Sequence, residues 1–319
     1  MARHLDEFLE AGTRTAPIPA DMSRLPDFII IGAMKCATST LHEQLARQPG
    51  LYMSDPKEPC FFSGDEAYAR GIASYASLFT AARAGGLCGE SSTHYTKLPT
   101  YPRTVERMRR HMPHVKLIYV MRHPIDRLVS HYIHEWSERT APDSIETAVR
   151  ECPRLTDYGC YAKQLRPYLD AYGPDCILPV FSERLRARSQ GEFERICRFI
   201  GYEEAPHWHS ERDGRNASAG RLRDNALRDA IVWNRGVTWL RRRFVPQSLR
   251  DRVKRVWQMK NRPQLSNATR ARLVLAFDQD LKTLGRWFGV ELNCENFTQV
   301  VTDEPLGFDG LLWKSQASA

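Results

Sequence analysis

The chain has 319 residues, of which 42% are apolar and 26% are charged, and its formal net charge is +8. This length fits one large α/β domain or two smaller ones, and the composition excludes a chain that is disordered throughout. No stretch approaches the ~18–20 consecutive apolar residues of a membrane span. Residues 1–19 lack the apolar run of a secretory signal, which favours a cytoplasmic protein with an N-terminal arm over residues 1–25.

Strand and helix patterns alternate along the chain. A β-branched run at residues 27–31 ends in Gly32 and is typical of a buried parallel strand, and a helix pattern follows from Thr38. Further strands are predicted at 87–89, 115–121 and 176–181, and further helices at 72–82, 101–111, 123–136, 161–172, 192–200 and 268–288. This order predicts an α/β fold, a parallel sheet flanked by helices. We expect one domain over residues 26–299, with a basic helical C-terminal portion, and a tail over 300–319.

Eight cysteines are scattered through the chain, with no C-x-x-C pair and no accompanying histidine cluster. A zinc site is therefore not expected, and reduced thiols are the default in a chain without a signal. A disulfide between Cys152 and Cys160 is the alternative.

The positive charge is concentrated in residues 212–262, which hold fifteen basic and four acidic residues. This excess indicates a polyanionic partner. Charge alone does not choose among a nucleotide, an acidic glycan, a nucleic acid and an anionic membrane surface.

The turn after the first strand carries Gly32, then Lys35, then the hydroxyl residues Thr38, Ser39 and Thr40 at the start of a helix. Free N–H groups and the helix dipole make such a helix start an anion site, as in a P-loop. The pattern is not the Walker A motif, which requires a Gly-Lys pair, and no acidic metal ligand follows a strand. These two departures argue against Mg·ATP as the substrate. An ordinary βα turn with an incidental lysine is the alternative.

A second group follows the strand at 115–121. Arg122 ends that strand, and Ser130 lies about two turns along the next helix. Together they could bind a second phosphate, which suggests a nucleotide with two separated phosphate groups. The alternative is that Arg122 and Asp126 form a solvated ion pair.

These two segments together resemble the paired cofactor signatures of sulfotransferases that use 3′-phosphoadenosine 5′-phosphosulfate (PAPS). The segment from Pro56 to Phe62, with Lys57 and Glu58, is similar to the bacterial and heparan-sulfate-type branch of that family. The resemblance spans residues 26–225 and rests on three motifs in order. It implies a P-loop-like fold and PAPS as co-substrate without a metal.

The resemblance also implies roles for individual residues. Arg122 and Ser130 would bind the 3′-phosphate, Tyr158 would lie beside the adenine, and Arg221 would belong to a loop that closes over the cofactor. The 5′-phosphosulfate would be bound by the turn residues Lys35, Ala37, Thr38, Ser39 and Thr40.

Sulfuryl transfer needs a base for the acceptor proton and cations for the moving group. Glu58 is the expected base: burial would raise its pKa and adjacent Lys57 would lower it. The alternatives are a solvated Lys57–Glu58 pair and His94 as the base. Lys35 would stabilise the bridging and leaving oxygens.

Three positions depart from the family pattern. Ala37 replaces a usual glycine, so we expect a negative φ there or a slight tightening of the loop. Cys60 replaces a usual histidine near Glu58. Ser91 replaces a lysine of glycan-modifying relatives, and Lys57 or Lys97 would substitute for it.

The sequence therefore predicts a sulfotransferase that moves a sulfuryl group from PAPS to a hydroxyl, or alternatively an amine, of a carbohydrate or small molecule. No nucleic acid is expected as a partner. Two other hypotheses remain open at this point: a metal-dependent nucleotide kinase, and a non-catalytic protein that binds nucleic acid or membrane through residues 212–262.

Overall fold

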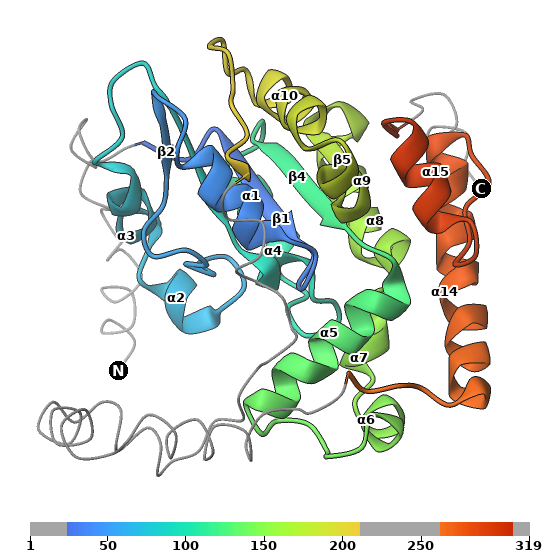
Figure 1. The fold of residues 1–319 in the computed structure, drawn as a ribbon. Helices are drawn as coiled ribbons and strands as arrows, with labels where there is room; N and C mark the ends of the chain where they lie inside the picture. Colours follow the sequence, from blue (N-terminus) through green and yellow to red (C-terminus); the bar gives the residue numbers. More distant parts are fainter. Residues whose placement is uncertain (1–23, 211–261, 309–319) are drawn as a thin grey trace, which may run out of the picture.

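The computed structural model describes residues 24–210 and 262–308 (Figure 1). A five-stranded sheet in the order β2-β3-β1-β4-β5, with every pair parallel, forms its centre. The α/β class predicted from the alternating patterns is confirmed. The strands are β1 (Phe28–Gly32), β2 (Leu51–Met53), β3 (Leu87–Ser91), β4 (Lys116–Met121) and β5 (Ile177–Phe181).

The sheet is buried because helices cover both of its faces. In β1 and β5 every residue is buried, and in β4 only Lys116 is partly exposed. Such strands read as continuous apolar runs, which is why the sequence pattern located them. The edge strand β2 was not predicted, because three residues carry too little pattern.

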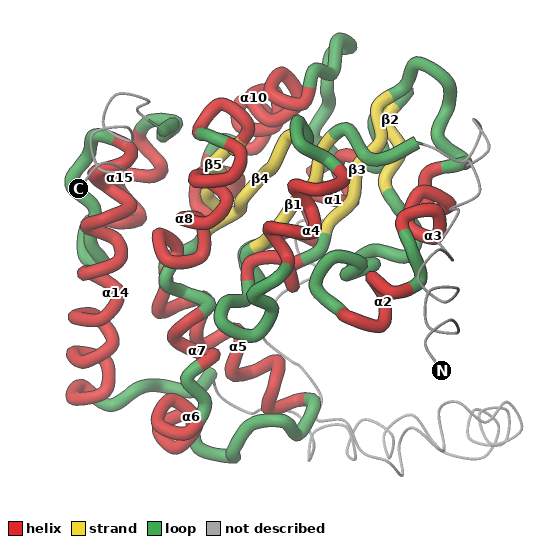
Figure 2. Tube along the Cα trace, turned by 180° about the vertical axis from the view of Figure 1, so that it is seen from behind, coloured by secondary structure: helices red, strands yellow, loops and turns green. Residues whose placement is uncertain are grey.

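Two helical layers enclose the sheet. Helix α1 packs on β1, β2 and β3, and α9 and α10 lie on the same face, in front in Figure 1. Helices α4 and α8 cover the opposite face, which is nearer the viewer in Figure 2. The helices that bear on the layers and the site are α1 (Thr38–Leu45), α4 (Thr104–His111), α5 (Pro124–Ser137), α6 (Ile145–Glu151), α7 (Arg154–Asp157), α8 (Tyr161–Tyr172), α9 (Ser182–Ala187) and α10 (Ser189–Ile200).

The C-terminal described segment returns to the domain. Helix α14 (Asn267–Phe288) packs along α8, and α15 (Phe297–Asp303) packs on α9. Ser266 caps α14 by accepting the Thr269 N–H, and Gly289 ends it in a left-handed conformation. Helix α15 runs across residue 300, where the sequence analysis placed the start of the tail, and Leu306 is still buried.

Shorter elements complete the described part: α2 (Asp65–Ala69), α3 (Ile72–Ala76), and the 3-10 turns η2 (Ser77–Phe79), η3 (Thr93–Thr96) and η4 (Pro174–Cys176). The eight cysteines, Cys152 and Cys160 included, are free thiols. Among helices of the described ranges, none has the length and apolar character to cross a bilayer.

Candidate functional site

The turn between β1 and α1 has the architecture of a phosphate loop. Gly32 has a φ of +147°, and a Cβ there would lie 2.0 Å from Thr96 Oγ1, so only glycine fits. Lys35 and Ala37 both adopt left-handed conformations, with φ near 70°. The first N–H groups of α1 have no partner within the helix and point out of its N-terminus, where they can bind an anion.

The conformation of Ala37 corrects one expectation. Its φ is +69° rather than negative, because the residue is the left-handed N-cap that turns the chain into α1. A non-glycine residue there pays a steric penalty of roughly 1–2 kcal/mol. The turn thus has the backbone conformation that glycine would favour, and the Cβ of Ala37 makes that conformation strained.

We therefore expect Ala37→Gly to raise the free energy of unfolding by about 0.5–1 kcal/mol, as measured by urea denaturation. Ala46→Gly is the matched control, because Ala46 ends the same helix at φ −60°, where glycine is expected to destabilise. A loss of stability in both variants would contradict the strain at Ala37.

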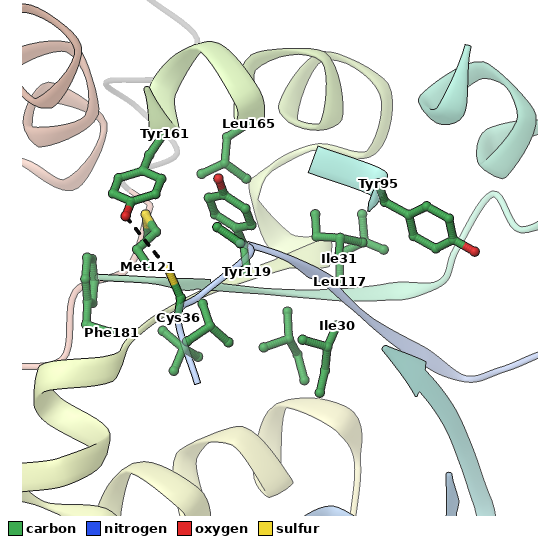
Figure 3. Close-up of a cluster of buried hydrophobic side chains, with 14 of the residues drawn as sticks. Ile30, Ile31, Cys36, Tyr95, Leu117, Tyr119, Met121, Tyr161, Leu165 and Phe181 are labelled. Carbon is green, nitrogen blue, oxygen red and sulfur yellow. Dashed lines mark hydrogen bonds between the residues drawn. The ribbon is translucent and has the colours of Figure 1, made fainter. Parts of the chain in front are cut away.

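The two phosphate motifs lie side by side, joined by Tyr161. Its hydroxyl donates to the Arg122 carbonyl at 2.5 Å and accepts the Arg122 N–H at 3.3 Å. The same hydroxyl lies 3.8 Å from the Cys36 thiol of the β1–α1 turn, as Figure 3 shows. Because β1 and β4 are parallel neighbours, their carboxyl ends open on one edge of the sheet.

Arg122 is placed as an anion ligand would be. Its side chain is 16% exposed, and its Nε is buried without a hydrogen-bond partner in the described structure. Asp126 is 4.0 Å away and is also bound by Arg262 at 2.6 Å. Ser130 lies two turns along α5 and is buried. A buried guanidinium nitrogen without a partner is a candidate donor to a phosphate oxygen.

Glu58 has a left-handed conformation in the loop after β2, beside the carboxyl end of β3. Its N–H donates to the Ser91 carbonyl at 3.0 Å. One carboxylate oxygen is 2.7 Å from Lys57 Nζ, and the other accepts the Thr93 hydroxyl at 2.8 Å. Burial raises the pKa of Glu58, but the charge of Lys57 and the hydrogen bonds from Lys57 and Thr93 lower it by more. The carboxylate is therefore ionised at neutral pH and able to accept a proton.

His94 lies near Glu58 and stacks on Tyr101, with ring centroids 4.9 Å apart. Burial and the charge of Lys97 lower its pKa to about 4, against an opposing influence of Glu58. A neutral imidazole can also accept a proton, so His94 stays a rival base.

The two lysines proposed to replace a lysine at position 91 differ in their surroundings. Lys57 is bound directly to Glu58, whereas Lys97 is buried, with its ammonium 5.9 Å from the centre of the Tyr158 ring. Ser91 itself is bonded to His42 Nδ1 at 2.9 Å. Lys57 is thus the lysine in contact with the candidate base.

Tyr158 is only 5% exposed, and its hydroxyl is bonded to Thr100. Its ring stacks on His131 at 5.7 Å. The tyrosine can therefore offer a ligand little more than an edge. Arg221, and all of the basic segment 212–262 except Arg262, lie outside the described residues.

Sequence analysis missed the role of Glu90, the buried carboxyl of β3. Tyr75 donates to one of its oxygens at 2.8 Å and Ser92 to the other at 2.9 Å. Ser92 in turn accepts the Cys60 N–H at 3.0 Å, which ties this carboxyl to the loop that carries Glu58. The signal available in the sequence was an acidic residue inside an otherwise buried strand.

Burial raises the pKa of Glu90 to about 7, from an ordinary value of 4.5. The folded protein then holds a proton between these values that the unfolded chain releases, so stability falls as pH rises from about 4.5 to 7. Glu90→Gln removes this dependence. We expect its stability relative to wild type to improve by up to about 3 kcal/mol between pH 4.5 and pH 8, measured by urea denaturation. If the variant and wild type differed in stability by the same amount at both pH values, the raised pKa of Glu90 would be contradicted.

In the described ranges, no group of three or more histidine, cysteine, aspartate or glutamate side chains is arranged to hold a metal ion. The site consists of cationic and hydroxyl residues at the carboxyl ends of β1 and β4, together with the Glu58 carboxylate in the loop beside the end of β3.

Comparisons with known proteins show similarity to sulfotransferases. A family model described as the sulfotransferase family matches residues 62–206, which include Arg122 and Ser130. The chain is 30% identical to mouse heparan sulfate glucosamine 3-O-sulfotransferase 3A1, over 60% of this chain and 50% of that protein. It is 31% identical to human heparan sulfate glucosamine 3-O-sulfotransferase 6, over 56% and 53%. The chain thus spans about half the length of these curated relatives.

Among solved structures, a sulfotransferase from Alicyclobacillus acidocaldarius superposes with a TM-score of 0.59 at 23% identity, covering 84% of this chain and 98% of that one. This similarity confirms the fold. It extends beyond residues 62–206, over most of the chain.

Proposed function

We propose that this chain is a sulfotransferase, which transfers a sulfuryl group from PAPS to a hydroxyl of a carbohydrate. The observation that carries the proposal is the link through Tyr161, which brings the β1–α1 turn and Arg122 to one edge of the sheet. Two anion sites so placed suit a nucleotide with phosphates on both sides of its ribose.

The residues present fit this co-substrate. The unpartnered Nε of Arg122 and the buried Ser130 would hold the 3′-phosphate. PAPS, when bound, supplies an activated sulfuryl group. The 5′ end would be held by Lys35, the N-terminus of α1 and the hydroxyls of Thr38, Ser39 and Thr40.

The chain's own residues would carry the proton and the charge. Glu58, ionised and fixed by Thr93, accepts the proton of the attacking hydroxyl. Lys35 offsets the negative charge that develops on the leaving phosphate. Positioning and electrostatics account for most of such a reaction, as they do in phosphoryl transfer.

The acceptor class rests on the curated relatives, whose names state that they act on heparan sulfate glucosamine. A glycan hydroxyl is accordingly the proposed acceptor.

The test of the proposed function is calorimetric titration of the full chain with adenosine 3′,5′-bisphosphate, the product nucleotide. Saturable one-to-one binding is expected. A wild-type protein that binds neither this nucleotide nor PAPS would refute the proposal, whatever its other properties.

A further inference from the structure

Arg127 is a buried cation that contacts no carboxylate in the described part of the chain. It lies on α5 with no exposed surface. Its Nη1 is 3.3 Å from His131 Nδ1, its Nη2 donates to the Leu155 carbonyl, and its Nε has no hydrogen-bond partner. Both of its polar contacts are therefore to neutral acceptors, provided that His131 is uncharged.

The surroundings fix His131 as neutral. Arginine can only donate, so His131 Nδ1 accepts, and Nε2 carries the proton toward Glu135 Oε1 at 3.0 Å. Burial lowers the pKa of His131 to about 4, although Glu135 opposes this. Glu135 also binds Arg154, through two hydrogen bonds of 2.7 and 2.9 Å.

Asp280 is a second carboxylate of this region, and its hydrogen bonds are to the backbone and not to Arg127. Asp280 of α14 accepts the backbone N–H groups of Ala162 and Lys163 at the start of α8. The charge of Arg127 is therefore only partly balanced from within the described protein. An unbalanced buried charge is costly, and a bound anion nearby would reduce that cost.

Arg127 lies close to both phosphate motifs. Burial raises the pKa of the Cys36 thiol, in the β1–α1 turn, to about 12, and the charge of Arg127 is the strongest influence opposing it. On α5, Ser130 is three residues beyond Arg127, on the neighbouring turn of the helix. Arg127 thus shares α5 with Ser130 and lies close enough to the β1–α1 turn for its charge to act on Cys36.

We propose that Arg127 is an interior electrostatic determinant of nucleotide binding: its charge attracts the two phosphates of the nucleotide across the ligand-contacting residues, without touching them. The inference rests on the proposed function. Its physical basis is that charges attract more strongly across a buried, low-dielectric region than through water. Arg127 does not contact the nucleotide in this scheme. Its hydrogen bond to the Leu155 carbonyl fixes the guanidinium in place, and the positive charge of the guanidinium strengthens nucleotide binding.

The test is titration with adenosine 3′,5′-bisphosphate and, by competition, with adenosine 5′-monophosphate. Arg127→Gln keeps a polar N–H donor, on a shorter side chain, and removes the charge. We expect it to weaken binding of the bisphosphate about 10- to 30-fold, and binding of the monophosphate by a smaller factor. Arg127→Lys keeps the charge and is expected to stay within about threefold of wild type.

Arg184→Met is the matched control. Arg184 is a buried arginine of α9 that is paired with Glu192, and its loss should leave nucleotide affinity unchanged. Equal losses for both nucleotides in Arg127→Gln would indicate a packing role and overturn the proposal, as would unchanged affinity. If the glutamine variant does not fold, a loss above about tenfold in Arg127→Lys overturns it, and near-normal binding supports it. Failure of wild type to bind either nucleotide would refute the proposed function instead.

Discussion

Lys35→Ala is expected to weaken binding of adenosine 3′,5′-bisphosphate by about 1.5–3 kcal/mol, or roughly 10- to 150-fold, in a calorimetric titration. Lys35 belongs to the turn that leads into α1, where, under the proposed function, its ammonium and the helix N–H groups would bind the same phosphate. A charged hydrogen bond lost from such a site is replaced only by water. Turnover should fall as well, because the leaving phosphate would lose its cation.

Lys163→Ala is the control for this prediction. Lys163 forms a half-exposed ion pair with Asp157 on the rim of α8, and its removal should change nucleotide affinity less than about twofold. Similar losses in both variants would mean that the nucleotide responds to the net charge of the protein. A change below about threefold in Lys35→Ala would place the nucleotide elsewhere on the molecule.

The sequence indicated much of the fold because burial on both faces leaves a plain signal. Strands β1, β4 and β5 are continuous apolar runs, and α14 repeats its buried positions with helical spacing. The edge strand β2 has three residues, one of them half-buried, and no periodicity can be read from so short a segment.

The convergence of the two phosphate motifs also followed from the sequence, since the ends of adjacent parallel strands share an edge. The contact that links the two motifs could not be predicted from the sequence. Tyr161 is 39 residues from Arg122 and 125 from Cys36, and no local pattern announces a hydroxyl shared between them. Long-range contacts of single polar atoms depend on side-chain directions that only the folded chain defines.

The backbone strain at Ala37 could not be predicted from the sequence either. A left-handed Ala37 contradicts its own residue preference, so the sequence alone favoured another conformation. The net pKa shift of Glu58 could not be read from the sequence for a related reason. Burial raises this pKa and Lys57 lowers it, and the hydrogen bonds from Thr93, which add to the lowering, join residues 35 positions apart.

The lowered pKa of Glu58 determines how the rate is expected to depend on pH. A general base with a lowered pKa is already ionised at neutral pH, so the rate should be level from neutral pH upward and fall only in acid, below the ordinary range of a glutamate. Such a base is weak, and its value comes from orientation: Thr93 holds one carboxylate oxygen and Lys57 the other.

Glu58→Gln is expected to reduce kcat by about 10²–10⁴-fold, because the glutamine amide cannot take the proton from the attacking hydroxyl. The measurement is release of adenosine 3′,5′-bisphosphate from PAPS, with the best acceptor of a glycan panel that begins with heparan sulfate. Nucleotide affinity should change little, since Glu58 lies in the loop after β2, beside the end of β3, and not in the β1–α1 turn. His94→Gln serves as the comparison and should lose far less activity. An active Glu58→Gln beside an inactive His94→Gln would assign the proton to the imidazole, whose lowered pKa also leaves it unprotonated at neutral pH.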